Sequence, residues 1–198
     1  MSETPRMLGN YTIEQSIYIG DKEVIFGVDH KATYPFMVCY CDYNNPLSAP
    51  WPSDAVASDD YLEVMSIFTD HVRKQIEQMQ SELAKFQFDM TPFTRDDCIP
   101  DDRVSNIIGK VVVINLENKR YEFQCSAYQL VLADGGNGAS GGRGSAVFGT
   151  NLATRERGRW ERFDVIGELK PSRMPEWAKV SLEEIHRKGQ QKSSREAR

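Results

Sequence analysis

Alternating apolar and polar residues near the start of the chain predict a β-hairpin. The segment 11–19 alternates in part, Gly20 and Asp21 are residues favoured in turns, and the segment 22–28 is again apolar. A further run, 36–43, is rich in aromatic and β-branched residues and follows a proline, which suits the start of a strand. The three runs together predict a three-stranded antiparallel sheet.

A proline-rich loop and then a long amphipathic helix should follow this sheet. The segment 44–58 holds three prolines, which predict a loop, and we expect Trp51 to anchor it. Ser58 and Asp59 are both N-cap candidates, because their side chains can accept hydrogen bonds from the first helical N–H groups. Apolar residues then recur at spacings of three and four: Leu62, Met65, Phe68 or Thr69, Val72, Ile76, Met79 and Leu83. We expect this stripe to pack on the sheet and the charged face to be solvated.

The second half of the chain reads as a series of short strands closed by a helix. The apolar run 110–116 predicts a buried strand. Four more strand-like runs follow at 121–126, 128–133, 144–152 and 160–169. Strands this short and closely spaced predict a small antiparallel sheet or a partly open barrel. Residues 174–188 form the closing helix, which we expect Gly189 to end.

These patterns predict an α+β protein with two modules. The N-terminal module, 1–88, combines an antiparallel sheet with one long amphipathic helix. An acidic linker, 89–106, leads to a β-rich module, 107–189, which carries a glycine-rich loop and the C-terminal helix. The polar residues 190–198 are expected to be a disordered tail.

Composition narrows the class of protein. Hydrophobic residues make up 40% and charged residues 27% of the chain, as in ordinary globular proteins. No stretch approaches the roughly 20 apolar residues that span a bilayer, and the first residues hold no signal-like apolar run. We therefore expect a cytoplasmic protein without a membrane partner. The sequence leaves its oligomeric state open.

The cysteines and histidines predict neither a metal site nor a catalytic one. Cys39 and Cys41 share one face of a strand, but Cys98, Cys125 and the three histidines do not sit at the short paired spacing of structural zinc. Buried, reduced thiols are the expected state. No histidine lies in a setting that suggests a nucleophile and base, so we expect no enzyme and no cofactor. A small hydrolase stays an alternative, because catalytic triads assemble from distant positions.

The segment 134–144 contains six glycines between two predicted strands. Glycine runs can let a backbone approach phosphate, which raises nucleotide binding as an alternative. A P-loop needs a lysine after its glycines, and a dinucleotide fingerprint leads from a strand into a helix. Neither requirement is met, so the segment predicts a long flexible hairpin loop.

Charge is unevenly distributed and marks two candidate binding surfaces. Residues 1–100 carry 7 basic and 16 acidic side chains, whereas residues 101–198 carry 17 and 13. The basic, aromatic-interleaved candidate comprises Arg143, Arg155, Arg157, Arg159, Trp160 and Arg162. The acidic candidate comprises Asp54, Asp59, Asp60 and Glu63. Arginine with tryptophan suits nucleic acid, and carboxylates suit a cationic partner.

The stretch QLVLADGGNGASGGRGSAVFGT, followed by RWERFDVIGELKPSRMPEWA, resembles a module of small accessory proteins on conjugative elements and plasmids of gut Gram-positive bacteria. The resemblance covers 107–188, with a weaker match over 11–83. Its features are Gln129, the glycine-rich loop, the charged hairpin 155–162, the strand 164–167 and the helix start 175–178.

This resemblance implies a role on a mobile genetic element and evasion of host defence. Some such accessory proteins are similar to anti-CRISPR proteins that inhibit type II-A (Cas9) effectors. The implied function is a non-enzymatic protein that binds and inhibits a Cas9-like nuclease. The alternative is a nucleic-acid-binding accessory factor that uses the Arg143–Arg162 cluster.

Overall fold

The chain folds into two compact units. The computed structural model describes the backbone of residues 5–42 and 51–196. Unit 1 spans Met1–Lys85 and unit 2 spans Phe86–Arg198. The predicted α+β class is confirmed, because two helices accompany two antiparallel sheets.

Unit 1 is built on a five-stranded antiparallel sheet in the order β1-β2-β3-β4-β5. The strands are β1 (Met7–Leu8), β2 (Tyr11–Ile19), β3 (Lys22–Val28), β4 (Phe36–Asp42) and β5 (Trp51–Ser58). The predicted hairpin is confirmed, with Ile19 opposite Lys22 and Gly20 at φ +62° in the turn between them. Only glycine adopts this left-handed conformation at no steric cost.

The strand β5 corrects the prediction of a loop over 44–58. Prolines argue against a central strand, but β5 is the last strand of the sheet and pairs only with β4. Pro52 is therefore tolerated, because an edge strand leaves one row of backbone groups unpaired. The predicted anchoring side chain of Trp51 and residues 43–50 lie outside the described part of the structure.

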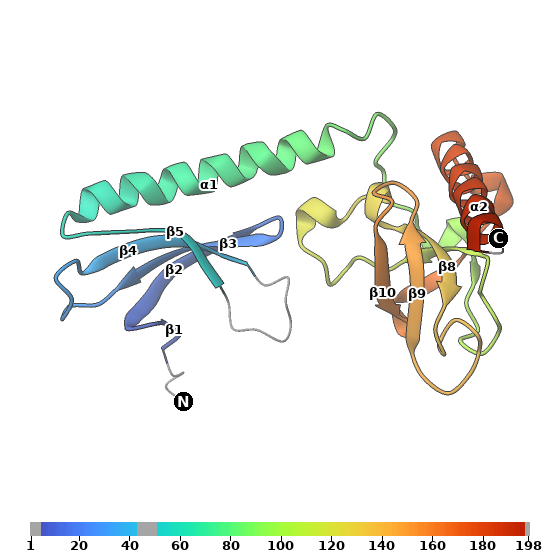
Figure 1. Cartoon of the computed structure of the whole chain (residues 1–198), viewed down its shortest axis with the longest axis horizontal. Helices are drawn as coiled ribbons and strands as arrows, with labels where there is room; N and C mark the ends of the chain where they lie inside the picture. Colours follow the sequence, from blue (N-terminus) through green and yellow to red (C-terminus); the bar gives the residue numbers. More distant parts are fainter. Residues whose placement is uncertain (1–4, 43–50, 197–198) are drawn as a thin grey trace. The chain divides into compact units, whose positions relative to one another are not determined.

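Helix α1 (Tyr61–Leu83) lies along one face of this sheet (Figure 1). Its N-cap is Asp60 rather than Ser58 or Asp59, and the Asp60 carboxylate accepts hydrogen bonds from two backbone N–H groups of the first turn. The buried stripe runs through Val64, Phe68, His71, Gln75 and Met79. The predicted stripe is therefore partly wrong: Leu62 is 75% exposed.

Two polar residues explain this shift of the buried face. The ring of His71 stacks on Tyr40 at 4.3 Å between centroids, and the Tyr40 hydroxyl donates to the His71 carbonyl. The Gln75 amide donates to Asp21 at 3.4 Å. Satisfied hydrogen bonds allow these side chains to be buried, although a count of apolar residues alone would place them outside.

The sheet face opposite α1 carries a second core. Ile25, Met37, Cys39 and Cys41 are buried there. Glu23 is also fully buried, and the guanidinium of Arg6 binds both of its carboxylate oxygens at 2.5 Å. A buried carboxylate requires such a partner, so the segment before β1 is fastened to the sheet.

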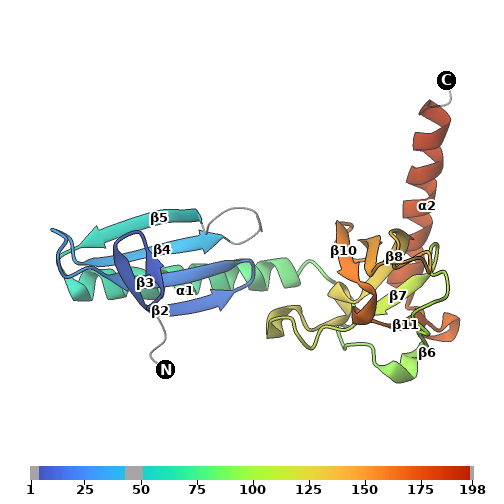
Figure 2. The ribbon, with the colours of Figure 1, turned by 90° about the horizontal axis from the view of Figure 1, so that it is seen from below.

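Unit 2 is built on a curled six-stranded antiparallel sheet, which confirms the predicted partly open barrel (Figure 2). The order is β10-β9-β8-β7-β11-β6. The strands are β6 (Cys98–Pro100), β7 (Val111–Ile114), β8 (Leu130–Gly135), β9 (Ala146–Asn151), β10 (Arg157–Glu161) and β11 (Val165–Leu169). Strand β7 is buried on both faces, since Val112 and Ile114 belong to one core and Val111 and Val113 to the other.

Two predicted strands of unit 2 differ from the structure. The predicted strand 121–126 forms two 3-10 turns, η2 (Tyr121–Phe123) and η3 (Ser126–Tyr128). The predicted strand 160–169 is divided by a third turn, η4 (Arg162–Asp164). At these turns the N–H of Ser126 donates to the Met90 carbonyl, and the Asp164 carbonyl accepts from the N–H of Asn115. Partners far along the chain therefore outweigh the alternating pattern.

The predicted acidic linker 89–106 belongs to unit 2 instead. It contains the turn η1 (Arg95–Asp97) and the edge strand β6, which pairs with β11. The Asp97 carboxylate accepts hydrogen bonds from Thr94 and from Arg173, 76 positions further along the chain. Long-range partners that sequence spacing does not reveal hold this segment in the unit.

The second helix, α2 (Glu176–Glu196), packs the partly buried Trp177, Leu182 and Ile185 onto one face of the unit 2 sheet. The turn η5 (Pro171–Arg173) precedes it. Gly189 does not end the helix, and residues 190–196 are helical rather than a disordered tail. None of the helices in the described residues combines the length and the apolar character that crossing a membrane requires.

Candidate functional site

Arg162 is the centre of a buried polar network in unit 2. Its guanidinium donates to both carboxylate oxygens of Asp101 at 2.5 and 2.7 Å, and both side chains are only 5% exposed. It also donates to the carbonyls of Gly138 at 2.7 Å and Ser105 at 3.0 Å. The backbone N–H of Arg162 donates to the Ser145 carbonyl. One side chain thus joins the loop 101–109, the glycine-rich loop and η4.

Arg162 is therefore placed differently from the sequence prediction, which put it on the basic surface. A bidentate, buried arginine–carboxylate pair fixes geometry and leaves little of the guanidinium for an external ligand. The partner Asp101 was not singled out in the sequence, because nothing in a spacing of 61 positions predicts the pair.

The glycine-rich segment is folded onto unit 2 rather than extended as a free hairpin loop. Ala139 is fully buried, and its carbonyl accepts a hydrogen bond from Ile107. A Cβ at Gly141, where φ is +75°, would lie less than 3.0 Å from the Val104 carbonyl. A Cβ at Gly138 would meet the Ser145 carbonyl equally closely. The glycines thus allow close approach within the protein itself.

The charged hairpin after β9 also has internal partners. Arg155 donates to the Ser181 carbonyl and pairs with Glu184 of α2 at 2.8 Å. Arg157 pairs with Asp134, and Arg159 pairs with Glu161 at 2.5 Å. Trp160 is partly buried and packs on the core that contains Val147 and Val165.

Arg143 stands apart from the other arginines of the predicted basic surface. It is exposed, and it has no ion-pair partner among the described residues. Arg103, which the sequence analysis did not single out, is likewise exposed and unpaired within the described ranges. Within the described ranges, Arg143 is thus the one arginine of the predicted basic surface without an ion-pair partner.

Three of the four acidic candidates of unit 1 lie at the junction of β5 and α1, and the fourth lies within β5. Asp59, Asp60 and Glu63 are exposed, as is Asp54 further back in β5. The Asp60 carboxylate caps α1, and Glu63 accepts a hydrogen bond from Ser58 at 2.6 Å. None of the four forms an ion pair with a described residue, so their charges are not neutralised locally.

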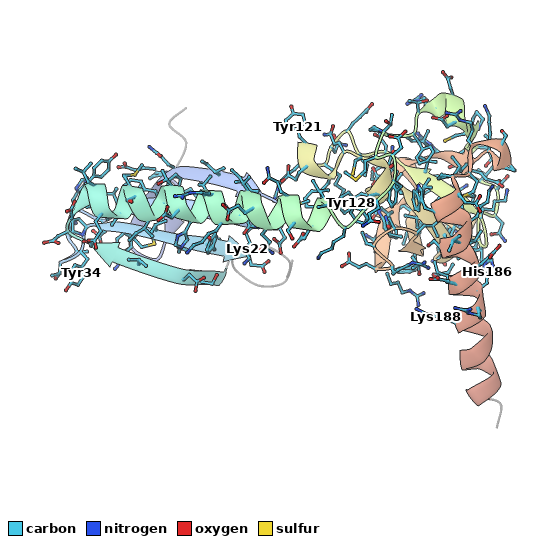
Figure 3. All side chains as sticks on the ribbon, turned by 90° about the horizontal axis from the view of Figure 1, so that it is seen from above. Lys22, Tyr34, Tyr121, Tyr128, His186 and Lys188 are labelled. Atoms are coloured by element: carbon cyan, nitrogen blue, oxygen red, sulfur yellow. The ribbon has the colours of Figure 1, made fainter. Side chains whose placement is uncertain are left out.

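Exposed apolar side chains lie beside these carboxylates. Leu62 is 75%, Tyr61 45% and Val56 38% exposed. Tyr34, 55% exposed, lies at the end of unit 1 where α1 begins, because Phe36 pairs with Ser58 (Figure 3). We call the residues Tyr34, Asp54, Val56, Asp59, Asp60, Tyr61, Leu62 and Glu63 the acidic corner. It combines charge with accessible apolar surface.

Unit 2 also holds a cavity of about 460 Å³ between the segment 92–96 and the residues that follow β7. Gln129 shapes it: the buried amide exchanges two hydrogen bonds with the backbone of Phe93, at 2.6 and 3.0 Å. Charged and amide side chains of Arg95, Asp96, Asn115, Glu117 and Gln124 line the cavity. Because the lining carries both charges, the cavity favours no single class of ligand.

The histidines, cysteines and carboxylates of the described residues do not gather in one metal-binding group. In the described ranges, no three His, Cys, Asp or Glu side chains group closely enough to hold a metal ion. His71 is buried in the unit 1 core, whereas His30 and His186 are exposed. Hydrogen bonds from Ser105 and Val104 lower the pKa of exposed Asp102 to about 2. This carboxylate therefore stays ionised, and its hydrogen bonds are made within its own loop.

No family model, curated protein or solved structure matches this chain.

The buried thiols provide a test of the unit 1 core. Burial raises the pKa of Cys39 to about 12, whereas an ordinary thiol titrates near 9.0. The unfolded chain ionises first as pH rises, so the folded state should lose stability between about pH 9 and 12. The melting temperature of the native chain should fall more steeply over this range than that of Cys39→Ala. Parallel curves would contradict the assigned burial.

Proposed function

We propose that this chain is a non-enzymatic, cytoplasmic binding protein of a mobile genetic element, and that its acidic corner binds a cationic protein surface. The observation that carries the proposal is the set of four exposed carboxylates without ion-pair partners among the described residues, beside exposed Tyr61 and Leu62. The partner we favour is a CRISPR effector nuclease of the Cas9 type, which the chain would inhibit by direct binding.

Charge supports an acidic recognition surface in unit 1. Residues 1–85 hold 6 basic and 13 acidic side chains. An RNA-guided nuclease holds its heteroduplex in a positively charged channel. An acidic surface is attracted to such a channel at long range, which accelerates association.

The exposed apolar side chains of the acidic corner can form the desolvated core of an interface, which charged side chains alone do not provide. Protein interfaces combine a desolvated core, often aromatic, with a polar rim. Tyr61 and Tyr34 can contribute large contact areas at low entropic cost, and Leu62 loses exposed apolar surface on binding. The acidic corner has both components within the short segment 54–63.

The identity of the partner rests on the resemblance to anti-CRISPR proteins rather than on the geometry. The alternative, a nucleic-acid-binding factor using the Arg143–Arg162 cluster, is less well supported. Arg155, Arg157, Arg159 and Arg162 already bind carboxylates of the same chain. Their charges are largely compensated before any ligand arrives.

Charge reversal tests the acidic corner. The pair Asp59→Lys and Glu63→Lys should lower the association rate with a purified type II effector by about tenfold or more, because the electrostatic attraction is replaced by repulsion. Stability should change little, since Asp60 still caps α1. Surface plasmon resonance at low and high salt measures the rate, and thermal unfolding checks the fold.

A matched control separates this surface from overall charge. Glu77 and Glu82 lie on the same helix, away from the acidic corner, and Glu77→Lys with Glu82→Lys changes the net charge equally. The control should retain most of the association rate. Equal losses in both pairs, or no binding of the native chain to any type II effector from suitable hosts, would overturn the proposal.

A further inference from the structure

Three loops of unit 2 are held together at one end of the sheet and present an unusual set of side chains. The Arg162 guanidinium bonds the carbonyls of Ser105 and Gly138, and its backbone N–H bonds the Ser145 carbonyl. Arg103, Arg143 and Phe163 each lie within two residues of one of these bonded groups. The network therefore brings these three residues, far apart in sequence, to the same end of the unit.

Each of the three side chains is accessible. Phe163 is 62% exposed, although large aromatic residues are usually buried. Arg103 and Arg143 are exposed and have no ion-pair partner in the described part of the chain, in contrast to the four paired arginines of the charged hairpin and η4. Val104, 71% exposed, and Ile108, 44% exposed, extend the apolar surface.

The carboxylate of Asp102, which precedes Arg103 in the sequence, is hydrogen-bonded within its own loop. Asp102 accepts hydrogen bonds from the backbone of Val104 and Ser105 and from the Ser105 hydroxyl. Arg103 itself is held at φ +64°, a left-handed conformation that non-glycine residues rarely adopt. The loop thus displays Arg103 without pairing it to its acidic neighbour.

We propose that this loop end, formed by Arg103, Arg143, Phe163, Val104 and Ile108, binds single-stranded nucleic acid. An exposed aromatic ring on which a base can stack, flanked by guanidinium groups that bind phosphates, is the combination that single-strand-binding proteins use. The site is separate from the acidic corner and from the charged hairpin.

The salt dependence of binding distinguishes phosphate contacts of the arginines from base stacking on Phe163. The probe is a labelled poly(dT) oligonucleotide of about 20 nucleotides, and its affinity is measured by fluorescence anisotropy over a range of salt concentrations. Arg103→Gln with Arg143→Gln removes two phosphate contacts, so the slope of log K against log salt should decrease in magnitude by about 1.4. Phe163→Ala should weaken binding by about fivefold or more and leave that slope unchanged, because stacking releases no counterions.

The control variant removes the same charge from arginines that are already paired. Arg157→Gln with Arg159→Gln should leave the slope nearly unchanged, because Asp134 and Glu161 already compensate these groups. All variants change exposed side chains, and thermal unfolding verifies that each is folded. A native chain that does not bind poly(dT) would overturn the proposal. Equal loss in the control pair, wild-type affinity of Phe163→Ala, or equally tight binding of a polyglutamate peptide would do the same.

Discussion

Replacing Arg162 with methionine should lower the free energy of unfolding of unit 2 by about 3–5 kcal/mol, the usual cost of leaving a buried charge without its partner. Asp101 would keep its carboxylate at 5% exposure with no counter-charge, and the carbonyls of Gly138 and Ser105 would lose their donor. Urea denaturation followed by the tryptophan fluorescence of unit 2 measures the loss.

Two variants show whether the loss belongs to the buried pair. Arg157→Met removes a surface pair in which the arginine is 71% exposed, and its effect should be within about 1 kcal/mol. Combining Arg162→Met with Asp101→Leu removes both charges and should recover much of the stability. A single Arg162→Met variant as stable as the native chain would contradict the network described here.

The substitution Gly141→Ala should destabilise unit 2 by about 2–4 kcal/mol, since it combines a left-handed φ with a steric clash. Its new Cβ would lie within 3.0 Å of the Val104 carbonyl, which is backbone and cannot rotate away. The loop 101–107 would have to move, and the Arg162 network with it.

Gly142 provides the matched control one position further along. A Cβ there would lie 3.4 Å from the Ser140 hydroxyl, close to ordinary contact, and Gly142 is not among the positive-φ glycines. Gly142→Ala should therefore cost less than about 1 kcal/mol. Thermal unfolding of both variants at equal protein concentration measures the two losses of stability. Equal losses would mean that the loop is not packed against Val104.

Local patterns predicted those elements whose stability is local. The bounds of β2 and β3 follow from alternation and a glycine turn, and the presence of α1 follows from its apolar spacing. The buried face of α1 was misjudged because His71 and Gln75 are buried by partners from other strands. Hydrophobicity alone cannot account for a polar side chain whose hydrogen bonds are supplied from a distance.

Among the candidate site residues too, those at a local sequence feature were easier to predict than those with distant partners. Asp59, Asp60 and Glu63 are exposed at the start of α1, and their role in binding stays a prediction. The basic cluster was misjudged at Arg162, whose acceptors are contributed by residues 24 to 61 positions away. Arg103 gave no signal, since a single arginine has no characteristic spacing.

The confinement of each core to one unit has an evolutionary consequence. All residues of two hydrophobic cores come from before Lys85, and all residues of the other two come from after Phe86. A recombination event between these two codons would deprive no core of its neighbours. Either half could therefore be inherited alone or joined to a foreign partner, and the two halves are free to evolve at different rates.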